Sequence, residues 1–159
     1  MSTYLIRRLI FIWIYGGSYH SEINPHRKCI ASIFSSISNI RQKREFFLES
    51  LCVLERGGKF RVGVPDTEWP ILAYANGDSS YFTLARDKWH PGWCDTRMHN
   101  INFHFRQGAE HKYAYDYETM EKVLAAAGFS SIVRTDFDPT VDSEARRTGT
   151  LYVEARKPD

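Results

Sequence analysis

The sequence is poor in cysteine, and its three cysteines, Cys29, Cys52 and Cys94, lie far apart. An odd number at this spacing gives no disulfide framework, which excludes the small secreted domains that depend on disulfides. We therefore expect a reducing compartment, the cytoplasm. Cys52 falls next to the apolar side of an expected helix, so we interpret it as a packing residue of the core.

Long apolar runs are also lacking. The run LIFIWIY at 9–15 follows Arg7 and Arg8 and is far shorter than the roughly 18 residues that a membrane-spanning helix needs. No small-residue cleavage site follows it, so it does not fit a secretory signal. We expect no membrane partner and interpret residues 4–15 as a strand.

Acidic residues are scarce at the beginning of the chain. Residues 1–44 hold seven Lys or Arg and one acid, Glu22, whereas residues 45–159 hold fourteen Lys or Arg and eighteen acids. The composition divides the chain into an atypical basic leader, 1–42, with one strand and an irregular segment, and a remainder, 43–159. No platform of aromatic and basic side chains accompanies the charge, so we expect no nucleic-acid partner.

Regular α/β patterns begin at residue 43. A stripe of apolar residues predicts a helix over 43–56: Phe47, Leu48, Leu51 and Leu54. Glycine at 57 or 58 can take the left-handed conformation that ends it. Alternating apolar residues then predict a short strand over 59–64, which Pro65 closes because proline donates no backbone hydrogen bond.

The last third of the chain is equally regular. Asp116 is a good N-cap for a helix from about 117, and Gly128 ends that helix. Two strands follow, at 131–137 and 150–156, too close in sequence for a crossover helix, so we expect an antiparallel pair.

Between these regular parts, residues 67–112 have no strong period after a short helix at their beginning. We interpret them as a functional insertion. Its Trp and Phe residues are expected to line a cap over a cleft or to fill a core.

Four segments, in this order, resemble the C-terminal half of class I S-adenosylmethionine-dependent methyltransferases, in particular the type 11 enzymes linked to saccharide modification. They are REFFLESLCVLERGGKFRVGVPD, HKYAYDYETMEKVLAAAGF, SIVRTDFDP and GTLYVEARKP, and they lie within 43–159. The resemblance implies an α/β fold, a partial Rossmann-like sheet that ends in an antiparallel strand pair. It also implies S-adenosylmethionine as methyl donor and a saccharide or another small molecule as acceptor.

The family's Gly-rich loop, which holds the methyl donor, is not found. From Gly17 to Lys59 there is room for one βαβ unit of about 30 residues, whereas the family needs several. We therefore place residues 9–15 as the family's fourth strand, directly before the helix at 43–56. The N-terminal Gly-rich half is expected to be missing, as in a truncated or misread gene product, and we do not expect this chain alone to bind S-adenosylmethionine.

Three residues are candidates for the site. Asp66 ends a strand at the carboxyl edge of the sheet, where open α/β sheets bind ligands, although a turn role after Pro65 is the alternative. If the resemblance holds, His111 and Tyr115 face the substrate cleft and are the candidate catalytic residues. His111 would take a proton from an acceptor hydroxyl, and the alternative is a loop histidine bonded to the backbone.

Histidines and a cysteine recur through the insertion: His90, Cys94, His99, His104 and His111. Zinc sites use tighter pairs, so we expect no metal. The alternative to an enzyme is a non-catalytic remnant or a partner-binding α/β module that associates through an exposed sheet edge.

Overall fold

The computed structural model describes residues 28–32, 40–107 and 113–159. Residues 4–15, for which we predicted a strand, lie outside this part of the chain. The candidate catalytic residue His111 lies outside it as well.

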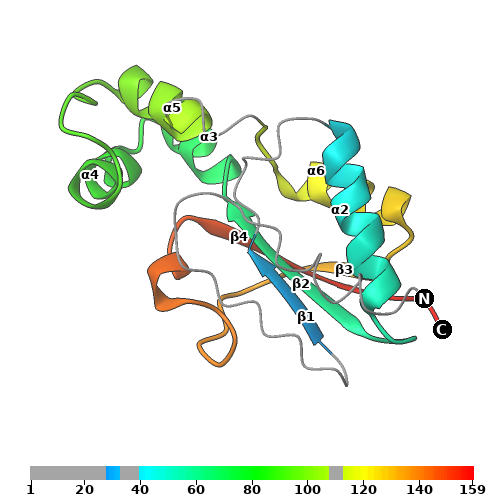
Figure 1. Ribbon diagram of the computed structural model, residues 1–159. Coiled ribbons are helices and arrows are strands. Elements are labelled where there is room, and N and C mark those ends of the chain that lie inside the picture. Colours follow the sequence, from blue (N-terminus) through cyan, green and yellow to red (C-terminus); the bar gives the residue numbers. More distant parts are fainter. Residues whose placement is uncertain (1–27, 33–39, 108–112) are drawn as a thin grey trace.

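A four-stranded sheet in the order β1-β2-β4-β3 forms the body of the molecule (Figure 1). β1 (Lys28–Ser32) runs parallel to β2 (Lys59–Pro65), and α2 (Ile40–Val53) connects them as a βαβ unit. β4 (Thr150–Arg156) lies between β2 and β3 (Ser130–Thr135) and is antiparallel to both. The predicted antiparallel pair is therefore confirmed, and the sheet is mixed.

The strand that precedes α2 differs from our expectation. We had placed residues 9–15 there, but Lys28–Ser32 takes the position beside β2, with Lys28 opposite Lys59 and Ser32 opposite Gly63. The sequence KCIAS contains few strongly apolar residues, so it did not stand out from its serine-rich surroundings.

The main core lies between the sheet and two helices, α2 and α6 (Tyr117–Ala127), which contact each other (Figure 1). Phe60 is fully buried, and its ring lies 6.1 Å from Phe47 of α2 and 4.9 Å from Phe129. The other members of this core are aliphatic or aromatic and come from the sheet, from α6 and from the segments next to α2 and α6: Leu54, Val62, Val64, Tyr115, Met120, Leu124, Ala127, Leu151, Val153 and Ala155. The predicted apolar stripe of α2 is confirmed.

Cys52 corrects one expectation, because its side chain is exposed. Leu51, one residue earlier on α2, packs against the core, and Leu54, directly after α2, is buried. Successive helical residues differ by about 100° in direction, which turns Cys52 toward solvent.

The ends of α6 match the predicted capping residues. Asp116 Oδ1 accepts a hydrogen bond of 2.8 Å from the backbone N–H of Thr119. Gly128 takes a left-handed conformation with φ of 99°, which ends the helix without the steric cost of a Cβ atom. Capping and apolar spacing together therefore define this helix in the sequence.

The insertion is more regular than the sequence indicated. It forms three short helices, α3 (Glu68–Ala75), α4 (Ser79–Lys88) and α5 (Arg97–Arg106), at one end of the sheet (Figure 1). They share a small core of their own: Ala73, Tyr81, Phe82 and Ala85. Helices of eight to ten residues that bury so few side chains show no clear period. Within the described part of the chain, no helix is long and apolar enough to cross a membrane.

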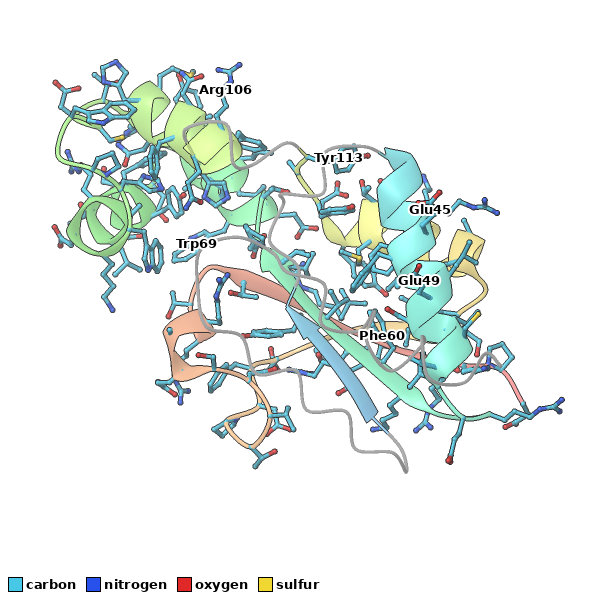
Figure 2. All side chains as sticks on the ribbon, in the orientation of Figure 1. Glu45, Glu49, Phe60, Trp69, Arg106 and Tyr113 are labelled. Atoms are coloured by element: carbon cyan, nitrogen blue, oxygen red, sulfur yellow. The ribbon has the colours of Figure 1, made fainter. Side chains whose placement is uncertain are left out.

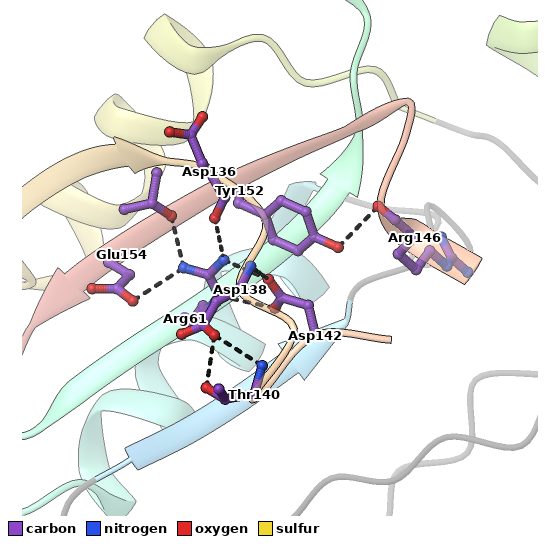
Figure 3. A network of polar contacts seen from close by, with 9 residues as sticks. Arg61, Asp136, Asp138, Thr140, Asp142, Arg146, Tyr152 and Glu154 are labelled. Atoms are coloured by element: carbon purple, nitrogen blue, oxygen red, sulfur yellow. Dashed lines mark hydrogen bonds and ion pairs between the residues drawn. The ribbon is translucent and has the colours of Figure 1, made fainter. Parts of the chain in front are cut away.

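Arg61 holds a loop to the other face of the sheet (Figure 3). The residue is 6% exposed, and its guanidinium donates five hydrogen bonds, to Asp142 (twice), Thr135, Glu154 and the carbonyl of Asp136. Burial alone would lower the pKa of Arg61, but the carboxylates of Asp142 and Glu154 outweigh it and raise the pKa. The sequence predicted only a polar strand residue at this position.

Candidate functional site

A cavity of about 340 Å³ lies where β2 ends and the insertion begins. Its floor is formed by Pro65, the last residue of β2, by Asp66, which follows it, and by Gly149 and Thr150 at the beginning of β4. Pro65 pairs with Thr150 in the sheet, and the backbone N–H of Asp66 donates to the carbonyl of Gly149 at 3.0 Å. The cavity is therefore at the carboxyl edge of a strand that belongs to a βαβ unit, where open α/β sheets bind ligands.

Aromatic and imidazole rings from the insertion form one wall of this cavity. They are Trp69, Tyr81, Trp89, His90, Phe103 and His104. Trp69 lies at the junction between the helices and the sheet, and its ring meets that of Tyr81 edge-on at 5.0 Å (Figure 2). Two side-chain caps fix the helices that carry the wall: Asp78 accepts from Ser80 N–H at the start of α4, and Thr96 accepts from His99 N–H at the start of α5.

Tyr81 and His104 form a hydrogen-bonded pair within this wall. The Tyr81 hydroxyl lies 3.1 Å from Nδ1 of His104. Burial, and to a lesser degree the charge of Asp66, raises the pKa of Tyr81 well above its ordinary value of 10.0. The hydroxyl therefore stays protonated at neutral pH and acts as a neutral hydrogen-bonding group.

Asp66 lines the cavity and also holds the beginning of α3. Its Oδ1 accepts from the backbone N–H groups of Glu68 (2.9 Å) and Trp69 (3.4 Å), and its Oδ2 lies 3.5 Å from Arg134. Glu68 in turn accepts from the backbone N–H of Tyr117 at 3.0 Å and pairs with Arg134, and these contacts lower its pKa. The turn role and the place at the cavity thus coexist, and a substrate contact by Asp66 remains a prediction.

Tyr115 lies close to Asp66 but away from this cavity. It forms an isolated β-bridge with Asp66, its carbonyl accepts from the Thr67 hydroxyl at 2.6 Å, and it is 4% exposed. Its side chain belongs to the main core and borders a second hollow of about 10 Å³. Burial raises the pKa of Tyr115, and the neighbouring Tyr113 raises it further to a smaller degree. Its catalytic role remains a prediction, as does that of His111, which lies outside the described residues.

The histidines of the insertion are held by other polar groups. His90 Nδ1 lies 2.7 Å from Oδ1 of Asn100, and His99 Nδ1 lies 2.7 Å from Oδ1 of Asp95. In the part of the chain that the structure describes, no three His, Cys, Asp or Glu side chains are grouped so that they could hold a metal ion.

A cradle for S-adenosylmethionine is not present in the described residues. None of their strands runs through a glycine-rich turn into a helix, since β2 leads through Pro65 and Asp66 into α3. Gly57 and Gly128, which have positive φ, precede β2 and β3 and so lie at the opposite edge of the sheet. The described residues therefore do not fit a methyl donor.

Sequence reasoning missed most of the cavity. The density of Trp and His in 67–112 was the available signal, and it correctly indicated a cap or a core. Which rings share one cavity depends on how three short helices pack, and no local pattern encodes that packing. The residues of 145–149 that line the cavity belong to a segment that the sequence indicated only as a polar connection between two strands.

No protein-family model matches the chain, and no curated protein matches it. Among solved structures, the chain is similar to the S-adenosylmethionine-dependent methyltransferase SibL in its apo form, at 18% identity and a TM-score of 0.50. The match covers 88% of this chain and 33% of that chain. The likeness extends to a putative O-methyltransferase from Nostoc punctiforme PCC 73102, at 14% identity and a TM-score of 0.45, over 86% of this chain and 33% of that one.

Two further solved structures are similar. A methyltransferase from Methanosarcina mazei matches at 12% identity and a TM-score of 0.45, over 87% of this chain and 64% of that chain. A protein from Bordetella parapertussis, described as possibly exported, matches at 17% identity and a TM-score of 0.48, over 86% and 42%. This chain thus spans about one third of SibL and no more than 64% of the others. As the sequence predicted, it has the α/β fold of the C-terminal part of an S-adenosylmethionine-dependent methyltransferase.

Proposed function

We propose that this chain forms the acceptor-binding part of an S-adenosylmethionine-dependent methyltransferase and that the acceptor, a saccharide or another small molecule, binds in the 340 Å³ cavity. The observation that carries the proposal is the position of the cavity. It lies at the carboxyl edge of β2, between the sheet and a ring-rich insertion. The free thiols Cys52 and Cys94 are in keeping with the cytoplasm as its location.

For methyl transfer, the acceptor-binding part of the enzyme mainly has to position the acceptor. Because a sulfonium methyl group is already activated, transfer depends mainly on holding the acceptor in the correct orientation. A cavity with aromatic walls does this for a small organic molecule and shields it from water. The methyl donor would have to bind to residues that the described part of the chain does not contain.

Two titrations of the purified full chain test this proposal. Calorimetry with S-adenosylmethionine should show no binding at micromolar concentration, and micromolar binding would contradict the assignment to the acceptor side alone. A panel of small saccharides and hydroxylated ring compounds should contain ligands whose affinity Trp89→Ala lowers. Trp93→Ala is the matched control, because Trp93 belongs to the same insertion but does not line the cavity. Equal effects of the two substitutions would refute a role for the cavity.

An alternative function, a partner-binding module, is favoured by the open sheet. Among the described strands, β1 and β3 each have one neighbour, and Val133 on β3 is 49% exposed. Sedimentation over a range of concentrations tests it, since association through an edge predicts dimers that dissociate on dilution.

A further inference from the structure

His90 is held by a hydrogen bond that fixes which of its ring nitrogens carries the proton. Its Nδ1 lies 2.7 Å from Oδ1 of Asn100, which is 1% exposed. The Asn100 amide nitrogen donates to two backbone carbonyls, those of Cys94 (2.8 Å) and Thr96 (2.7 Å). Carbonyl oxygens only accept, so this amide has one possible orientation, with Oδ1 facing His90. His90 must therefore donate from Nδ1.

The second ring nitrogen of His90 is then a hydrogen-bond acceptor. In neutral imidazole only one nitrogen carries a proton, so Nε2 has a lone pair. His90 lines the cavity, and its Nε2 makes no hydrogen bond with any residue that the structure describes. Burial lowers the pKa of His90 more than the bond to Asn100 raises it, which keeps the imidazole neutral.

The ring of His90 lies among three other rings of the cavity wall. The ring of Phe103 lies 5.0 Å away, that of His104 6.3 Å and that of Tyr81 6.4 Å, measured between ring centroids. Faces and edges of aromatic rings favour a planar aromatic guest, which packs against them in offset or edge-on geometry. Within this wall of rings, Nε2 of His90 is an acceptor of fixed orientation, and a single hydroxyl on a planar guest satisfies it.

We propose that the cavity binds a phenol, a planar ring whose hydroxyl donates a hydrogen bond to Nε2 of His90. This inference makes the proposed function more specific. The view that the phenol is a methyl acceptor rests on that proposed function. Binding itself depends only on the cavity and involves no methyl donor.

Calorimetry with 2-naphthol and 2-methoxynaphthalene on the full chain tests the proposal. The two compounds share a ring system, but the ether has no hydroxyl proton. The wild-type chain should bind 2-naphthol roughly 2- to 10-fold more tightly, the contribution of one hydrogen bond. His90→Asn should abolish this preference, because asparagine keeps a donor near the position of Nδ1 but has nothing at Nε2. His99→Asn is the matched control and should keep it, since His99 bonds to Asp95 and does not line the cavity.

The binding of the ether shows whether His90→Asn still has a formed cavity. If that variant does not fold, the wild-type chain gives a second measurement. The preference for 2-naphthol should fade on acidification below the ordinary histidine range, as protonation removes the lone pair. Four other ionisable side chains line the cavity: Tyr81, His104, Asp66 and Arg146. Their titration should change the affinity for both compounds, so the affinity for the ether, measured over the same pH range, corrects for it.

Three results would overturn the proposal: equal affinities for the two naphthalenes in the wild-type chain, a preference that survives in His90→Asn, or methyl α-glucopyranoside binding more tightly than 2-naphthol. Failure of the methyltransferase assignment looks different. If only that assignment fails, 2-naphthol still binds with the expected dependence on His90. It is then not converted to 2-methoxynaphthalene when a partner protein carrying the methyl donor is added.

Discussion

The buried ion pair between Arg61 and Asp142 makes a quantitative prediction for the Asp142→Ala variant. The two side chains are 7% and 3% exposed. Asp142 accepts from Nε and Nη2 of Arg61, at 2.9 and 2.5 Å, and from the backbone N–H of Asp138 at 2.8 Å. Its removal leaves a buried guanidinium without two of its acceptors. Loss of one partner of such a pair typically costs about 3–5 kcal/mol, out of roughly 5–15 kcal/mol for a whole domain.

Urea unfolding followed by far-ultraviolet circular dichroism measures this loss. Glu144→Ala is the matched control, because Glu144 also pairs with an arginine in the same connection but is exposed, so the unfolding midpoint should not move. Adding Arg61→Met to Asp142→Ala should recover part of the lost stability, since it removes the stranded charge. A loss below about 1 kcal/mol for Asp142→Ala would refute the view that this pair anchors the loop.

Three further predictions concern packing, pH and capping. Gly63→Ala should destabilise the fold by about 1–3 kcal/mol, because the new Cβ would lie 2.9 Å from the ring of Tyr152. Gly92→Ala is the control and should not destabilise it, because a Cβ at Gly92 would have no atom within 4 Å. Thermal unfolding of the two variants measures the difference. The folded state lowers the pKa of Glu68, so its contribution is present above the ordinary value of 4.5 and is lost as pH falls through the lowered pKa. Glu68→Gln should thus be less stable than wild type at pH 7, with the difference shrinking in acid; a difference that grew in acid would contradict this. Asp116→Ala removes the N-cap of α6 and should cost about 0.5–2 kcal/mol in urea unfolding, and no measurable loss would show that the cap is dispensable.

Elements whose signals are local were predictable from the sequence. The helix α6 has its cap at Asp116, its apolar spacing and its terminal Gly128 within one short segment, and β2 and β4 alternate over a buried face. Strand β1 lacked such a signal because it is five residues long and its place depends on pairing with β2. Local patterns were therefore sufficient to predict the order of helices and strands, but not to predict which strands pair when they are distant in sequence.

The candidate site was predictable only in outline. The carboxyl edge next to Asp66 follows from the strand and its proline, and the structure does place a cavity there. The role of Arg61 could not be predicted, because an arginine on the polar side of a strand is normally a surface residue. Here it is covered by a loop whose Asp142 lies 81 positions later in the sequence. His90 was hidden for a related reason, because its tautomer depends on an asparagine ten positions away that is itself fixed by two carbonyls.

The place of β4 has a consequence for how the chain is made. This strand fills the gap between β2 and β3, and its register joins Lys59 to Arg156. On the ribosome, both neighbours emerge before the strand that pairs with them, so the nascent chain exposes the unpaired edges of β2 and β3 until β4 appears. Such late closure, over almost a hundred residues of intervening chain, makes slow folding and chaperone dependence the expected behaviour during synthesis.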